Sequence, residues 1–80
     1  MARLLFLGRL EDIAGADARV VAVPGVVTLA ELLTMLPPGL AEALAGPKVK
    51  LALNGVLVSP ADVQVSDSDE LAFLPPVSGG

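Results

Sequence analysis

The chain has 80 residues, 54% of them hydrophobic, and a formal net charge of −4 from nine acidic and five basic residues. It contains no Cys, His, Trp or Tyr, which excludes thiol nucleophiles, imidazole bases, disulfides and zinc sites with Cys or His ligands. The few, scattered basic residues argue against nucleic-acid binding. Pro, Gly and Glu interrupt every apolar run before it reaches the about 20 residues that a membrane span needs. We therefore expect a cytoplasmic protein without nucleic-acid or membrane partners.

The first 25 residues of the chain predict a β-hairpin. Residues 3–10 (RLLFLGRL) form the first strand, and residues 11–15 (EDIAG) form a short helical turn closed by Gly15. Residues 18–25 (ARVVAVPG) form a second strand that ends at its proline and glycine. We expect the two strands to pair across the intervening turn.

The clearest helix is predicted for residues 28–37 (TLAELLTMLP). Thr28 is a favourable N-cap and Glu31 follows three residues later, which is the capping-box pattern. Leucines recur at helical spacing and supply an apolar face. Pro37 and Pro38 end this helix, and residues 39–46 add another helical turn or two.

The second half of the chain predicts three more strands. Residues 48–59 form a strand, an Asn54-Gly55 turn and a short strand. Residues 60–70 form a loop whose acids sit in a turn, and residues 71–75 form the last strand. This order indicates an α+β fold, namely a β-grasp (ubiquitin-like) roll with a mixed sheet packed on one main helix. The rival, a ferredoxin-like split βαβ fold, needs a second full helix.

The first and last strands are apolar on both faces, so we expect one face to meet the core and the other to meet a partner. Phe6 and Phe73 are the only aromatic residues and are assigned to the core. The opposite face is then the predicted partner-binding surface, and it consists of Leu5, Leu7, Ala72 and Leu74, joined by Leu57. The alternative assignment exchanges the two faces.

The chain ends in FLPPVSGG, residues 73–80. Pro75 and Pro76 cannot continue a ladder, so residues 1–76 are expected to form the domain and residues 77–80 a flexible tail. Val77 and Ser78 extend the tail, and Gly79 and Gly80 present an unshielded carboxylate that can enter a narrow channel. A carboxylate is a poor electrophile, so Gly80 would require activation by another enzyme. The alternative is a frayed end without a role.

The chain resembles the family of molybdopterin synthase small subunits, which are ubiquitin-like sulfur carriers. The resemblance is carried by the stretch from Leu53 to Gly80, above all by its ending FLPPVSGG, and by the N-terminal RLLFLGRLEDIAG. The resemblance implies that an adenylating enzyme related to ubiquitin-activating enzymes uses ATP to form an acyl-adenylate on Gly80. Sulfur delivered by a sulfurtransferase then gives a thiocarboxylate. The tail enters the large subunit, which transfers the sulfur to cyclic pyranopterin monophosphate to build the molybdopterin dithiolene.

The same resemblance implies that this chain is not catalytic alone and binds no cofactor of its own. The family assembles as a heterotetramer, with two small subunits on a dimer of large subunits. Three alternatives stay open: a sulfur carrier for thiamine or tRNA thiolation, a ubiquitin-like protein modifier, and a plain interaction domain whose final glycines have no role.

One segment departs from the family pattern. The family's acidic turn commonly reads Asp-Gly-Asp-Glu, whereas this chain has Asp67-Ser68-Asp69-Glu70. Because serine tolerates a positive φ poorly, we predict that the turn takes another type. We interpret these acids as a solvated turn and expect no metal site there, since the ligand spacing of a calcium loop is absent.

Overall fold

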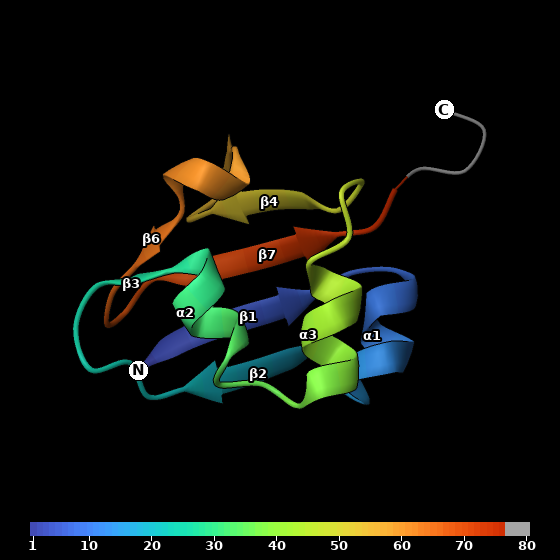
Figure 1. Cartoon of the computed structure of the whole chain (residues 1–80), viewed down its shortest axis with the longest axis horizontal. Helices are drawn as coiled ribbons and strands as arrows, with labels where there is room; N and C mark the ends of the chain where they lie inside the picture. The colour runs from blue at the N-terminus through green and yellow to red at the C-terminus, as the bar shows by residue number, and fades with distance from the viewer. Residues whose placement is uncertain (77–80) are drawn as a thin grey trace.

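The computed structural model describes residues 1–76 of the chain. A five-stranded mixed sheet forms one layer of the molecule and short helices cover one of its faces (Figure 1). The strand order is β2-β1-β7-β4-β5. The strands are β1 (Ala2–Phe6), β2 (Ala18–Val21), β4 (Lys50–Leu53), β5 (Val56–Val58) and β7 (Glu70–Leu74).

The sheet is organised around its central parallel pair, β1 and β7, in which Leu4 is opposite Leu71 and Phe6 opposite Phe73. β2, the hairpin partner of β1, and β4, the hairpin partner of β5, flank this pair and run antiparallel to it. This is the β-grasp arrangement that the sequence predicts, and it excludes the ferredoxin-like alternative.

The helical layer is divided among three short helices: α1 (Arg9–Ala14), α2 (Leu29–Leu33) and α3 (Pro38–Leu44). The predicted capping box is present, with the Glu31 amide donating to Thr28 Oγ1 at 3.2 Å and the Thr28 amide donating to Glu31 Oε1 at 2.9 Å. The helix ends at Leu33, earlier than predicted. Pro38 occupies the first turn of α3, where its missing N–H costs nothing, so the proline pair also starts the next helix. No helix within residues 1–76 is long and apolar enough to cross a bilayer.

The first two strands are shorter than predicted. β1 stops at Phe6 because Gly8 has a φ of 55°, and Arg9 and Leu10 belong to α1 instead. The predicted helical turn and its end are confirmed, since Gly15 closes α1 with a φ of 78°. β2 ends at Val21 because Val21 already pairs with Ala2, at the start of β1.

The prediction of a loop over residues 60–70 is wrong in its first part. A 3-10 turn (Pro60–Asp62) leads into β6 (Gln64–Val65), which pairs antiparallel with β3 (Val27–Thr28). Val63 and Val65 are 1% and 0% exposed. The segment therefore closes the core beside α2, and only its second part is a turn.

The core lies between the inner face of the sheet and the helices. Phe6 and Phe73 stack at its centre, with ring centroids 5.9 Å apart and an interplanar angle of 16°. Leucines from the helices fill the space above them, including Leu10, Leu32, Leu40 and Leu44. Within residues 1–76 no polar or charged residue is buried, so apolar burial holds the two layers together.

Candidate functional site

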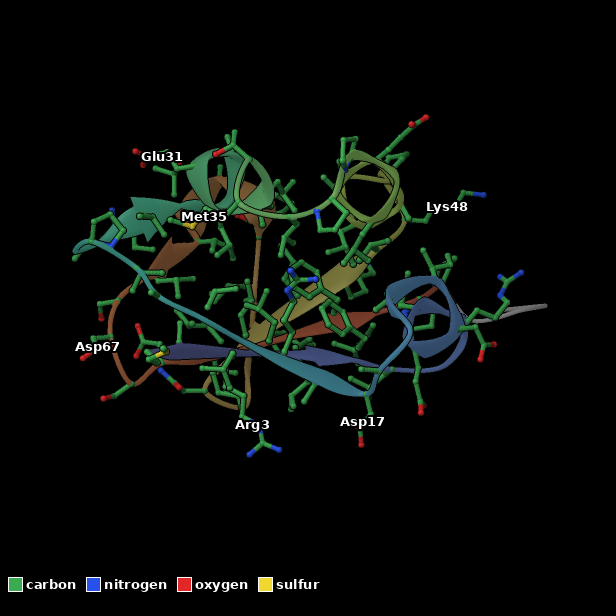
Figure 2. The ribbon with its side chains drawn as sticks, turned by 90° about the horizontal axis from the view of Figure 1, so that it is seen from below. Arg3, Asp17, Glu31, Met35, Lys48 and Asp67 are labelled. Carbon is green, nitrogen blue, oxygen red and sulfur yellow. The ribbon has the colours of Figure 1, made fainter. Side chains whose placement is uncertain are left out.

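The outer face of the sheet is free of helices and carries a continuous apolar row. The strand register aligns one residue from each of the five strands across this face, in the order Ala18, Leu5, Ala72, Ala52 and Leu57. Paired residues of neighbouring strands point to the same side of a sheet, so these side chains form one band. Figure 2 shows the helices gathered on the opposite side, whereas the labelled Arg3 side chain of β1 points away from them.

The structure confirms the predicted assignment of the two faces. Leu4, Phe6, Leu71 and Phe73 are at most 2% exposed. On the outer face, Leu5 and Leu74 are half-buried, and the exposed fractions of Leu7 and Leu57 are 41% and 70%. The outer apolar face is defined here as Leu5, Leu7, Ala52, Leu57, Ala72 and Leu74. Its role in binding a partner stays a prediction.

Charged residues border the outer apolar face. Arg3 and Glu70 are paired on one side of the apolar row, and Lys50 is paired with Leu74 on the other. An apolar centre with a charged rim is the usual anatomy of a protein interface. This arrangement suits docking to another protein better than binding a small molecule in a cavity.

Ala52, which lies in the row between Ala72 and Leu57, is not among the residues predicted for this face. The two-residue Asn54-Gly55 turn fixes the register of the β4–β5 hairpin, because both residues have a positive φ, 50° and 84°. That register places Ala52 opposite Leu57. Applying the turn rule to the sequence would have found it. Small side chains at Ala52 and Ala72 leave room for a partner to approach the backbone closely.

The last strand delivers the chain to one end of the molecule. β7 spans Glu70–Leu74, one residue earlier at both ends than the predicted 71–75, because Pro75 has no N–H to continue the ladder; Figure 1 shows this end on the same side as α1 and α3. Pro75 is half-buried and Pro76 exposed. A Cβ added at Gly8 would lie 2.8 Å from Pro75 Cγ, so the turn before α1 packs directly against the root of the tail. Val77, Ser78, Gly79 and Gly80, predicted as tail and reactive end, lie outside the described residues.

The acidic turn is a hydrogen-bonded structural element. Asp69 Oδ2 accepts from the Ser66 amide at 2.8 Å and from the Ser66 hydroxyl at 2.9 Å, while Asp69 Oδ1 accepts from Asn54 Nδ2 at 3.0 Å. The Asn54 side chain and the two Ser66 donors hold the pKa of Asp69 below its ordinary value, because they stabilise the charged carboxylate. The carboxylate therefore joins this turn to the β4–β5 turn.

The prediction that serine would force another turn type is wrong. Ser68 adopts a φ of 73°, in the left-handed region that glycine usually occupies. Its amide donates to the Met1 carbonyl at 3.0 Å, the Met1 amino group forms an ion pair with Asp67, and the Asp69 amide closes the turn on Ser66. These contacts offset the conformational cost of the positive φ at Ser68. No cluster of three or more metal-binding side chains is found among the described residues.

Comparison with known proteins agrees with this architecture. A model of the ThiS family matches residues 4–80. The molybdopterin synthase sulfur carrier subunit of Escherichia coli (strain K12) is 38% identical over 82 residues, covering 100% of both chains.

Two solved structures extend the comparison. One is a chain in the complex of subunits 1 and 2 of molybdopterin-converting factor from Helicobacter pylori, with a TM-score of 0.68 and 27% identity over 99% of this chain and 97% of that one. The other is small archaeal modifier protein 1 of Haloferax volcanii, with a TM-score of 0.78 and 25% identity over 95% of this chain and 97% of that one. Both share the β-grasp fold described above.

Proposed function

The chain belongs to the ThiS family, and from this premise we propose that it is the sulfur-carrier subunit of a cytoplasmic molybdopterin synthase. The observation that carries the proposal is the 38% identity, over the whole chain, to the Escherichia coli subunit of that name. The composition supports it, since a chain without Cys can still carry sulfur on its terminal carboxylate.

The proposed chemistry takes place at Gly80. An adenylating enzyme joins the Gly80 carboxylate to the α-phosphorus of ATP and releases pyrophosphate. Hydrosulfide, released when a thiol reduces the persulfide of a sulfurtransferase, then attacks the activated carbonyl carbon, AMP leaves, and a thiocarboxylate remains. The ATP is bound by the activating enzyme, and this chain contributes the carboxylate and its access.

The proposed acceptor complex is formed with the large subunit. Pro75 and Pro76 direct the tail, and Val77, Ser78 and Gly79 carry the thiocarboxylate of Gly80 into that subunit. The large subunit's own residues then transfer the sulfur to cyclic pyranopterin monophosphate. Two such transfers complete the dithiolene. The outer apolar face docks on the large subunit, and two copies of the chain on a large-subunit dimer make a heterotetramer.

Deletion of Gly80 tests this function. We expect the truncated chain to lose sulfur transfer to the pterin completely, because the acceptor atom of the sulfur has moved by one residue. Residues 1–76 contain every strand and helix described, so the thermal unfolding midpoint should stay that of the full chain. Pterin-dependent activity that survived the deletion would contradict the proposal.

A second candidate, a ubiquitin-like protein modifier, is favoured by one observation. The structure of small archaeal modifier protein 1 resembles this chain with a TM-score of 0.78. A modifier would form an isopeptide bond between Gly80 and a lysine of another protein. Finding such adducts in cells, without a thiocarboxylate on the free chain, would favour the modifier over the sulfur carrier.

A further inference from the structure

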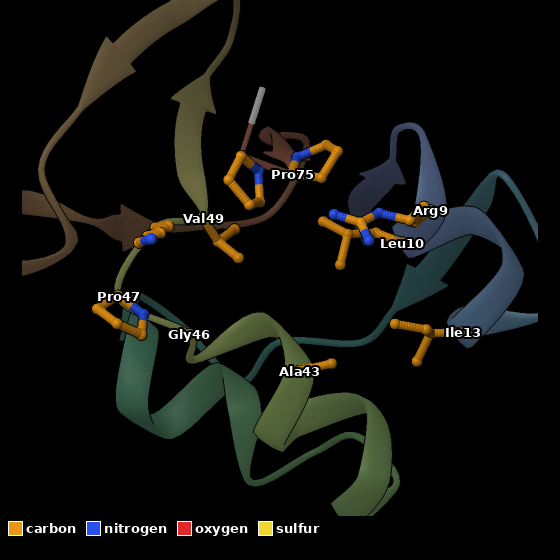
Figure 3. Close-up of a pocket in the computed structure, with 10 residues that line it drawn as sticks. Arg9, Leu10, Ile13, Ala43, Gly46, Pro47, Val49 and Pro75 are labelled. Atoms are coloured by element: carbon orange, nitrogen blue, oxygen red, sulfur yellow. The ribbon is translucent and has the colours of Figure 1, made fainter. Parts of the chain in front are cut away.

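An apolar pocket of about 340 Å³ lies where the tail leaves the sheet (Figure 3). It is bounded by α1, by α3, by the loop of residues 46–49 and by the two prolines. In Figure 3, Ile13, Ala43, Val49 and Pro75 surround the opening from different elements. A volume of this size accommodates one or two large apolar side chains.

Both charged residues that line this pocket are basic, although the whole chain has a net charge of −4. They are Arg9, at the start of α1, and Lys48, in the loop before β4. Within residues 1–76, neither has a carboxylate within ion-pair distance. Figure 3 shows the Arg9 side chain extending over the opening. The pocket therefore presents an apolar floor under two positive charges that have no ion-pair partner among residues 1–76.

The position of the pocket connects it to the tail. Pro75 and Pro76 are at once part of the pocket wall and the root of the tail. Leu74, the preceding residue, belongs to the outer apolar face. A protein that encloses the tail must pass over these prolines, so the surface it covers is continuous with the pocket.

We propose that this pocket is a second docking site for the large subunit, in addition to the outer apolar face. Its occupant is a segment of that subunit with one bulky aliphatic or aromatic side chain in the pocket and a carboxylate against Arg9 or Lys48. The apolar lining supplies burial, and the two cations select the acidic segment. This inference rests on the proposed function, since it names the partner that receives the tail.

Ala43→Leu tests the apolar part of the inference. The larger leucine side chain fills the pocket from α3 without removing any contact. The helix itself should be preserved, because leucine has a high helix propensity. Ala30→Leu is the matched control, since it makes the same change at an exposed position of α2 outside the pocket. We expect Ala43→Leu to weaken binding to the purified large subunit about tenfold or more, and Ala30→Leu to change it by less than about twofold.

Arg9→Glu tests the charged part and does not depend on the first variant. An acid in the first turn of a helix is favourable, so α1 should be preserved. Arg19→Glu gives the same net charge on β2, away from the pocket. We expect Arg9→Glu to weaken binding about tenfold at low salt and less at high salt, because screening reduces such a loss. Arg19→Glu should have little effect at either salt concentration.

The outcomes separate this inference from the proposed function. Equal affinities of Ala43→Leu and Ala30→Leu for the large subunit, with a wild-type chain that binds it and acquires a thiocarboxylate, would overturn the pocket inference alone. Weakened binding to the activating enzyme, or weakened self-association, with unchanged binding to the large subunit would overturn it as well. A wild-type chain that never acquires a thiocarboxylate would instead overturn the proposed function.

Discussion

The two faces of the central strand pair carry similar side chains in different surroundings. Leu4, Phe6, Leu71 and Phe73 lie under the helices and are at most 2% exposed. The outer apolar face has leucines and alanines on the same strands and no helix above it (Figure 2). Hydrophobic side chains alone therefore do not mark the core. Helix cover on one side of the sheet makes the difference.

The two faces also differ in what they contribute, stability on one side and binding on the other. The inner face contains both aromatic rings, stacked at the centre of the core. The outer face contains the most exposed of the leucines, Leu57, which is 70% exposed. We infer that the inner face determines the free energy of unfolding and that the outer face determines the affinity for a partner.

Phe73→Ala is expected to have the largest effect. It removes a fully buried ring and leaves a cavity, so it should lower the free energy of unfolding by about 3–5 kcal/mol. Leu57→Ala is the matched truncation on the outer face and should change the free energy of unfolding by less than about 0.5 kcal/mol. Urea unfolding of both variants checks the expectation, and similar losses in the two would contradict the assignment of the faces.

Leu57→Asp should weaken binding to the large subunit about tenfold or more while leaving the fold intact. The control is Val56→Asp, which places the same charge on the preceding residue of β5, where the strand alternation directs it to the opposite side. Val56 is also exposed, at 64%. Binding titrations distinguish the two variants. If Val56→Asp had the larger effect, the docking face would be on the other side of the sheet.

Asp69→Asn tests the contact that joins the acidic turn to the β4–β5 turn and so helps hold the register of the outer row. Because hydrogen bonds lower the pKa of Asp69 in the folded protein, its ionisation stabilises the fold fully above the unfolded value of about 3.9. That contribution is lost as the pH falls through the folded pKa. The variant should therefore show a flatter decline of stability below about pH 4, measured by thermal unfolding. An unchanged acid profile would contradict this role.

Ser68→Gly is expected to have the smallest effect. Glycine relieves the cost of a positive φ, so the free energy of unfolding should rise by up to about 1 kcal/mol. The reverse change in the neighbouring turn, Gly55→Ser, should lower it, because Gly55 has a φ of 84°. Denaturant unfolding measures both. A loss of stability in Ser68→Gly would show that the serine side chain supports the turn.

The inner and outer faces of the sheet could be predicted from the sequence, because they follow from patterns within single strands. Alternation along β1 and β7 fixes which residues share a side, and Phe6 and Phe73 identify the inner one. The capping box at Thr28 and the Asn54-Gly55 turn were equally local and equally correct. These local features predict most residues of the outer apolar face, but not Ala52.

The remaining features depend on contacts between distant segments. β6 is two residues long and forms only because β3 lies beside it. Ser68 keeps a positive φ because Met1 and Asp69 hold its turn. The apolar pocket at the root of the tail is lined by residues from four separate segments, namely Arg9, Ala43, Lys48 and Pro75. No pattern within a single window of the sequence could reveal such arrangements.

The most direct test of the central claim is mass spectrometry of the intact chain after incubation with its activating enzyme, ATP and a sulfur donor. A sulfur carrier should gain the mass of one oxygen-to-sulfur exchange, located at Gly80 by fragmentation and absent when ATP is withheld. A fully activated reaction that leaves the mass of the chain unchanged would contradict the sulfur-carrier function.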